Sequence, residues 1–195
     1  MTNLDKAIEF AAQVHKGMIR KGNNQPYIFH PLEVLSLVSM MTNDEEILAA
    51  AVLHDTVEDT PATIDDIKSQ FGERVAELVG YESEDKRGQV NKAGTWVERK
   101  QEAIDTLSKV DDIGAKMVAL GDKVSNLRSF HLLQLQEGDK LWDHFNMKDP
   151  TKHFWYYSEV AKALADLKDY AVYKEYLFLI DTIFSKYLKE ANHEE

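Results

Sequence analysis

The segment 53–60 places four ionisable side chains directly after an apolar run. His54 and Asp55 are adjacent, and each has a carboxylate four residues later, namely Glu58 and Asp59. On a helix, adjacent residues are about 100° apart and residues four apart share a face, so the four side chains would occupy one polar sector. An imidazole with a carboxylate suits a borderline divalent cation such as Mn²⁺, Fe²⁺, Co²⁺ or Zn²⁺. The segment therefore predicts a metal site at a helix end, with an ordinary solvated helix end as the alternative.

Two other positions offer donors of the same kind. His30 follows an apolar segment and precedes a helix start, where a buried structural histidine is the alternative. Asp122 lies in the apolar helical pattern 118–128 with Asn126 one turn later on the same face, which an amphipathic helix would also explain. Two imidazoles and two carboxylates would leave coordination positions for water and substrate. The expected order of ligands along the chain is His30, His54, Asp55 and Asp122.

Helices must position these residues, because apolar side chains recur at helical spacing along almost the whole chain. Thr2 with Asp5, Asp44 and Thr63 are expected to begin helices. The segment 80–95, with three glycines, is the longest expected loop. Sustained apolar–polar alternation and Asn-Gly hairpins are both missing from the sequence. The expected fold class is all-α, a helical bundle around one core.

The composition limits the function. The chain has 195 residues, no cysteine, 34 acidic and 23 basic residues, and a net charge of −11. We expect one domain over 1–195, without disulfides, a thiolate zinc site or a cysteine nucleophile. The acidic charge argues against nucleic-acid and anionic-membrane partners. It allows a small phosphorylated ligand, because a bound cation and a few basic side chains can reverse the local potential. No signal peptide or membrane span is recognisable, so we expect a cytoplasmic protein.

Together these motifs resemble the small alarmone hydrolases, which are stand-alone hydrolase domains of the RelA/SpoT type in the HD metallohydrolase superfamily. The resemblance covers about residues 5–165 and implies a single HD-domain helical bundle. The helix expected at about 170–190 would serve as core or dimer contact, in a monomer or homodimer. The matching segments are RKGNNQPYIFHPLEV, AAVLHDTVEDT, ESEDKRG with TWVERKQEAIDTL, VALGDKVSNLRS, LWDHFN and WYYSEV.

The resemblance also implies roles for individual residues. One Mn²⁺ would be held by His30, His54, Asp55 and Asp122. Glu58 and Asp59 would orient and deprotonate the attacking water. Arg20 and Lys21 would lie near the phosphates or base of the substrate, and Asn126 would help to hold its nucleoside. Physical chemistry agrees, because a cation screens phosphoryl charge and a carboxylate one turn from a ligand can accept a proton from the water.

The implied activity is hydrolysis of the 3′-pyrophosphate of guanosine tetraphosphate or pentaphosphate (ppGpp or pppGpp). The products would be GDP or GTP and pyrophosphate, and the reaction would end the stringent-response signal. Two alternatives use the same residues: an HD phosphohydrolase acting on NADPH or adenosine polyphosphates (ppApp), and an inactive nucleotide sensor. A phosphodiesterase of the HD-GYP kind would need further histidines and a Gly-Tyr-Pro motif, which the sequence lacks.

Three further features are less specific. Tyr156, in an aromatic run, is a candidate to stack on the substrate's purine or ribose, with packing as the alternative. The basic residues of 86–100 suggest a flap over a polyphosphate, or plain surface charge. Long RelA/SpoT enzymes commonly have Ala, Arg and His where this chain has Gly121, Lys123 and Ser125. These differences leave the expected ligands in place but affect contacts made by neighbouring side chains.

Overall fold

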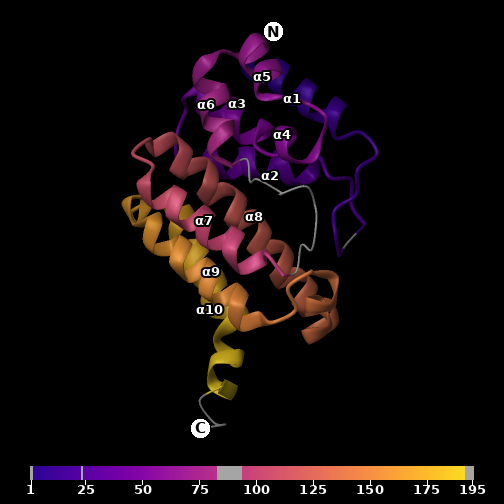
Figure 1. Ribbon diagram of the computed structural model, residues 1–195, viewed down its shortest axis with the longest axis vertical. Coiled ribbons are helices and arrows are strands. Elements are labelled where there is room, and N and C mark those ends of the chain that lie inside the picture. Colours follow the sequence, from indigo (N-terminus) through magenta and orange to yellow (C-terminus); the bar gives the residue numbers. More distant parts are fainter. Residues whose placement is uncertain (1, 23, 83–93, 192–195) are drawn as a thin grey trace.

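The computed structural model describes residues 2–22, 24–82 and 94–191 (Figure 1). Within these ranges the chain is helical, and its one β feature is an isolated bridge between Ile19 and Pro26. The expected all-α class is confirmed. None of the helices in this part of the chain is long and apolar enough to cross a membrane. The elements are α1 (Asn3–Val14), α2 (Phe29–Val38), α3 (Glu45–Leu53), α4 (Thr56–Asp59), α5 (Ile64–Phe71), α6 (Glu73–Glu82), α7 (Trp96–Lys109), α8 (Ile113–Glu137), η2 (Gly138–His144), α9 (Pro150–Ala163), η3 (Ala165–Leu167) and α10 (Ala171–Ala191).

Side-chain caps begin several helices where the sequence predicts them. Thr2 and Asp5 form a reciprocal capping box at α1, and Thr63 and Asp66 form another at α5. Asp44 accepts hydrogen bonds from the first backbone N–H groups of α3. Each cap satisfies donors that have no partner within the helix. Local sequence therefore determines where α1, α3 and α5 start.

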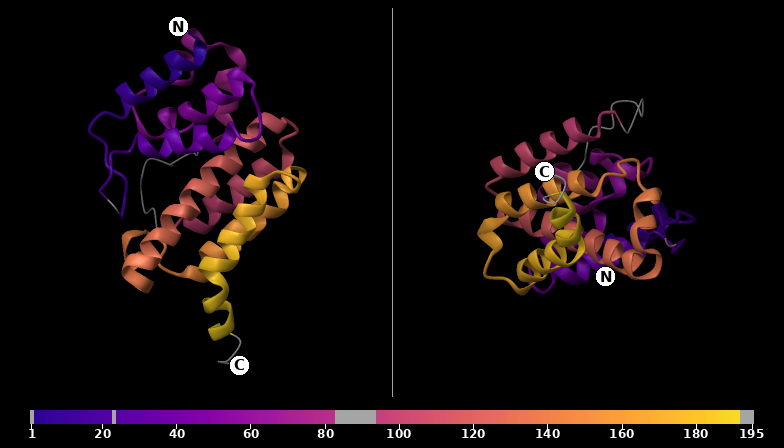
Figure 2. Two further views of the ribbon diagram at one scale, coloured as in Figure 1. Left: turned by 180° about the vertical axis from the view of Figure 1, so that it is seen from behind. Right: turned by 90° about the horizontal axis from the view of Figure 1, so that it is seen from below.

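Helix α8 connects the two sides of the molecule. It is 25 residues long and packs against α2, α3 and α6 on one side and against α10 on another. The views from behind and below show α1–α6 gathered on one side and α9 and α10 on the other (Figure 2). Most of the length of α8 is buried, including Asp122. A polar side chain on α8 is thus held by packing from both sides.

Close contact between α2 and α8 depends on Gly121. A Cβ atom added there would lie 2.9 Å from Val38 Cγ2 and 3.2 Å from Val34 Cγ1. It would also lie 3.3 Å from the Val34 carbonyl oxygen, which cannot move without shifting the helix. The glycine therefore allows the backbones of α2 and α8 to approach, and these two helices carry His30 and Asp122.

The expected loop 80–95 is corrected at its start, because α6 continues to Glu82 and Gly80 is helical. Residues 83–93 lie outside the described residues, and with them most of the basic segment expected to form a flap. At the other end of the chain, α10 buries Tyr176, Ile183 and Phe184 completely. That helix is part of the core, while its second expected role, a dimer contact, stays a prediction.

We predict that Gly121→Ala lowers the free energy of unfolding by up to ~2 kcal/mol net, because overpacking a core usually costs about 1–3 kcal/mol. This cost exceeds the ~1 kcal/mol that alanine gains over glycine in a helix. Gly80→Ala is the matched control, because its Cβ would meet only Ile64 Cδ1 at 3.9 Å. It should raise stability by up to ~1 kcal/mol. Denaturant unfolding followed by circular dichroism measures both, and a stabilised Gly121→Ala would contradict the packing argument.

Candidate metal centre

The chain bends between α3 and α4, where the sequence predicts one continuous helix. Helix α3 ends at Leu53 and α4 begins at Thr56. The Thr56 hydroxyl donates to the Leu53 carbonyl at 2.6 Å, and the Thr60 hydroxyl donates to the Thr56 carbonyl at 2.6 Å. Such side-chain bonds compete with the helical backbone ladder and bend it. His54 and Asp55 occupy the bend, with His54 Nε2 and Asp55 Oδ2 3.1 Å apart.

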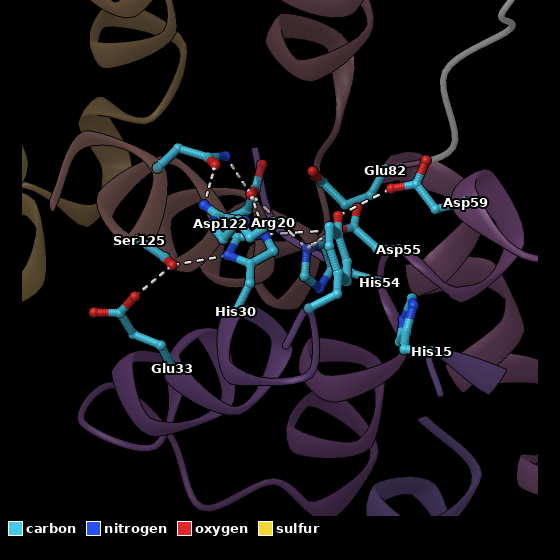
Figure 3. A network of polar contacts seen from close by, with 12 residues as sticks. His15, Arg20, His30, Glu33, His54, Asp55, Asp59, Glu82, Asp122 and Ser125 are labelled. Carbon is cyan, nitrogen blue, oxygen red and sulfur yellow. Dashed lines mark hydrogen bonds and ion pairs between the residues drawn. The ribbon is translucent and has the colours of Figure 1, made fainter. Parts of the chain in front are cut away.

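All four expected metal ligands converge at this bend (Figure 3). His30 comes from α2 and Asp122 from α8. His30 Nε2 lies 3.1 Å from Asp122 Oδ1 and 3.3 Å from Asp55 Oδ2. His54 Nε2 lies 3.8 Å from Asp122 Oδ1, and the ligand atoms of His30, His54 and Asp122 are all within 4.8 Å of one another. Residues far apart in sequence thus form one compact group of donors.

The hydrogen bond at Nδ1 of His54 determines which of its ring nitrogens can bind a metal. Its Nδ1 is 2.9 Å from the carbonyl oxygen of Ala51, which can only accept a hydrogen bond. The neutral ring therefore carries its proton on Nδ1 and turns an unprotonated Nε2 toward the carboxylates. That Nε2 is buried and makes no hydrogen bond within the described residues. A lone pair facing carboxylates needs a positive charge between them, and a divalent cation meets that need.

The electrostatics of the group favour a cation. Burial lowers the pKa of His54, but the carboxylates of Asp55 and Asp122 outweigh it and raise that pKa to about 9. Burial raises the pKa of Asp55, but the His54 and His30 rings outweigh burial and hold that pKa well below the ordinary value. The pKa of Asp122 is lowered against burial by Lys123 and His30. The site thus stabilises positive charge among its carboxylates, and its donor set fits a divalent transition metal.

Tyr27 contacts both Asp55, an expected metal ligand, and Asp59, an expected catalytic residue. The sequence alone does not predict a role for Tyr27. Its hydroxyl lies 2.6 Å from Asp55 Oδ2 and 2.9 Å from Asp59 Oδ2. Burial and both carboxylates raise the pKa of Tyr27, so the phenol keeps the one proton that the two carboxylates share. Its position three residues before His30, in the PYIFH segment, is the only sequence signal that points to it.

Asp122 is held by a second set of contacts. Lys123 Nζ lies 2.5 Å from Asp122 Oδ2 and 3.3 Å from Glu82 Oε2, a pairing that the sequence analysis does not anticipate. Asn126 donates to Asp122 Oδ1 at 2.6 Å, and Arg20 donates to Asn126 Oδ1 at 2.7 Å. Two residues expected to contact substrate are therefore connected directly to an expected metal ligand.

Two adjoining cavities open from this centre, with volumes of about 470 Å³ and 480 Å³. The first is lined by His30, Asp55, Asp122 and also by Tyr156. The second contains Lys21 and lacks the four expected ligands. Both cavities are lined by Arg20, Tyr27, Glu58, Asp59, Arg99, Lys100 and Asn126.

The expected substrate residues thus fall into different positions. Arg20 and Asn126 stand where the cavities meet, whereas Lys21 is exposed and lines only the second. Tyr156 is buried, and Lys100 Nζ lies 5.0 Å from the centre of its ring, within range of a cation–π contact. Stacking of Tyr156 on a base stays a prediction.

Comparison with known proteins identifies the domain. The model of the HD domain matches residues 7–148. The chain belongs to the HD domain family. This membership and the His/Asp cluster together identify the centre as a site for a divalent metal.

Relatives of this HD domain are longer proteins. It is 34% identical over 138 residues to guanosine-3′,5′-bis(diphosphate) 3′-pyrophosphohydrolase of Aquifex aeolicus, covering 71% of this chain and 19% of the relative. It is 37% identical over 132 residues to the bifunctional (p)ppGpp synthase/hydrolase SpoT of Escherichia coli K12, covering 67% of this chain and 18% of the relative. The HD domain therefore spans less than two thirds of these curated relatives.

Two solved structures are matched over nearly their whole length. One is described as a metazoan ortholog of SpoT that hydrolyses ppGpp, with TM-score 0.72 and 27% identity, covering 95% of this HD domain and 96% of that chain. The other is lmo0812 of Listeria monocytogenes EGD-e, with TM-score 0.70 and 29% identity, covering 80% and 99%. The second structure leaves about a fifth of this chain unmatched.

We predict that Tyr27→Phe weakens Mn²⁺ or Co²⁺ binding by about 10- to 100-fold, the usual cost of losing a partner of a metal ligand. The reason is that Asp55 loses its 2.6 Å hydrogen bond and is free to turn. Calorimetric titration measures the affinity, with Tyr170→Phe at the start of α10 as a control for loss of a hydroxyl. Wild-type affinity in a folded Tyr27→Phe protein would show that the contact does not support the site.

Proposed function

We propose that the protein is a Mn²⁺-dependent hydrolase that removes the 3′-pyrophosphate of ppGpp or pppGpp. The products are GDP or GTP and pyrophosphate, and the reaction ends the stringent-response signal. The observation that carries the proposal is the cluster of His30, His54, Asp55 and Asp122 beside two adjoining cavities whose shared wall includes basic side chains. Relatives and a structural neighbour named for ppGpp hydrolysis support the choice of substrate.

The residues around the cluster support hydrolysis of a phosphate ester. His30, His54, Asp55 and Asp122 would hold a divalent ion, which would polarise a phosphoryl group and lower the pKa of water. Glu58 lines both cavities and is half-buried, so it is placed to take the proton of the attacking water. Asp59, oriented by Tyr27, is its companion. Water attacks phosphorus, the bond from phosphorus to the ribose 3′-oxygen breaks, and that oxygen takes a proton.

The shared wall of the cavities supports binding of a polyphosphate. Arg20, Arg99 and Lys100 line both cavities. Guanidinium and ammonium groups bind phosphate oxygens by charge-assisted hydrogen bonds. Glu58 and Asp59 line the same wall, so a bound divalent cation would be needed to add to this positive charge. We therefore assign the scissile pyrophosphate to the first cavity, next to the metal ligands.

The second cavity supports binding of the nucleoside. Its lining includes the aromatic side chains of Trp96, Phe130 and Phe145. Aromatic rings accept a purine by stacking, whichever purine it is. Lys21 at this cavity is placed for the 5′-phosphates, and Asn126 at the junction for the ribose. Since stacking tolerates adenine, an HD phosphohydrolase of NADPH or ppApp is the second candidate.

We predict that Mn²⁺-loaded protein converts ppGpp into GDP and pyrophosphate, and that EDTA abolishes the conversion. Anion-exchange chromatography of the products measures this, with NADPH and ppApp incubated in parallel. Cleavage of only NADPH or ppApp would assign the same centre to the second candidate. Failure of all three substrates with metal bound would contradict hydrolysis and indicate a nucleotide sensor.

We predict that Glu58→Gln and His54→Ala fail in different ways. Glu58→Gln should bind Mn²⁺ like wild type but lose about 10²- to 10⁴-fold in turnover, the usual contribution of a general base. His54→Ala should lose both metal and turnover because it removes a ligand. Atomic absorption and product release measure the two properties, with Glu9→Gln on exposed α1 as the control. Wild-type turnover by Glu58→Gln would overturn its assigned role.

A further inference from the structure

A chain of hydrogen bonds leads from His30 away from the metal centre to α10. His30 Nδ1 lies 2.8 Å from Ser125 Oγ, and Ser125 Oγ donates to Glu33 Oε2 at 2.6 Å (Figure 3). Arg128 Nη1 donates to Glu33 Oε1 at 3.0 Å. The Nε and Nη2 atoms of Arg128 donate to both carboxylate oxygens of Glu175 at 2.6 Å and 2.9 Å. Ser125, Glu33, Arg128 and Glu175 have no part in the catalytic steps above.

Only one arrangement of protons is consistent with all the hydrogen bonds of this chain. A carboxylate only accepts hydrogen bonds, and a serine hydroxyl has one proton. Because Ser125 gives its proton to Glu33, it can offer only a lone pair to His30 Nδ1. His30 must then carry a proton on Nδ1, and its neutral ring presents an unprotonated Nε2. That Nε2 faces Asp122 Oδ1 at 3.1 Å, on the side of the metal centre.

We infer that Glu33 is a positioning residue for His30: acting through Ser125, it selects the ring tautomer whose Nε2 can bind the metal. The inference rests on the proposed metal centre. Glu33 lies on α2, three residues after His30, and Ser125 lies on α8. The pair therefore fixes the ring across the same helix contact that brings His30 to Asp122. Where long RelA/SpoT enzymes commonly have a histidine, this chain uses Ser125 with Glu33.

Because of Arg128, residue 33 must be a carboxylate, and not an amide, to accept the proton of Ser125. The Nη1 atom of Arg128 donates to Glu33 Oε1, and its Nε and Nη2 atoms donate to Glu175. A glutamine at position 33 would have to turn its oxygen toward Arg128 and its NH₂ group toward Ser125, because two donors repel. Ser125 would then accept from the amide and donate to His30 Nδ1. The proton order would reverse, and His30 would carry its proton on Nε2, where the metal binds.

Glu33→Gln tests this order through Mn²⁺ affinity, measured by counting free Mn²⁺ in electron paramagnetic resonance titrations. We expect a loss of about 10- to 100-fold, as for other partners of metal ligands. Glu33→Gln/Arg128→Met should recover most of the affinity, because the amide is then free to turn its oxygen toward Ser125. Glu175→Gln is the matched control, since it removes the same charge but leaves the Ser125 proton order intact. It should bind Mn²⁺ like wild type.

The outcomes separate this inference from the proposed centre. If His30→Ala binds Mn²⁺ as well as wild type, the metal centre is wrong and the inference falls with it. If His30→Ala loses Mn²⁺ while Glu33→Gln keeps wild-type affinity, only the role of Glu33 is overturned. A loss in Glu33→Gln that Arg128→Met does not relieve would also overturn it, because the loss would then be a general structural effect.

A spectroscopic readout tests the same point without metal. Nitrogen NMR of the imidazole rings distinguishes a proton on Nδ1 from one on Nε2. In metal-free wild-type protein with neutral rings we expect His30 to carry its proton on Nδ1, and in Glu33→Gln on Nε2. A wild-type His30 protonated on Nε2 would overturn the inference even if the variants fail to fold.

Discussion

Compensation of charge among buried groups is the constraint on which this structure depends. Two imidazoles, His30 and His54, are almost completely buried, with two carboxylates within 3.8 Å of their Nε2 atoms. Such a group is unfavourable in a protein interior unless a cation or additional protons balance it. Burial, tautomers and shifted pKa values all follow from this one requirement. An HD domain meets it with a divalent metal.

Contacts between helices, and not loops, bring these charged groups together. Gly121 brings α2 against α8, so His30 and Asp122 approach from opposite sides of one helix contact. The bend after Leu53 adds His54 and Asp55 from a third direction. Catalytic sites that rest on helices hold their geometry better than sites on loops. Stability and reactivity therefore depend on the same packing, which is why a single methyl group at Gly121 is expected to matter to both.

The parts of this site that depend on neighbouring residues can be predicted from the sequence. The ligands are recognisable because imidazole and carboxylate side chains interrupt apolar helical segments, and the caps at Thr2, Asp44 and Thr63 depend on neighbouring residues alone. The bend at His54 is missed because hydroxyl-to-carbonyl bonds from threonines override the helical period. Contacts between residues distant in sequence cannot be predicted from local pattern either. Glu33 and Ser125 are 92 residues apart, and Lys123 and Glu82 are 41 apart.

The structure therefore supports the proposed type of reaction more strongly than the proposed identity of the base. Three of the expected metal ligands, His30, His54 and Asp122, are buried, so each contact constrains the next. The second cavity is bordered by Trp96, Phe130 and Phe145, whose rings stack on any purine, and by exposed Lys21, which recognises charge alone. Stacking and charge bind a nucleotide strongly without distinguishing guanine from adenine. Discrimination must come from hydrogen bonds to the edge of the base, so the selectivity of the proposed hydrolase among ppGpp, ppApp and NADPH would depend on polar groups around the aromatic wall.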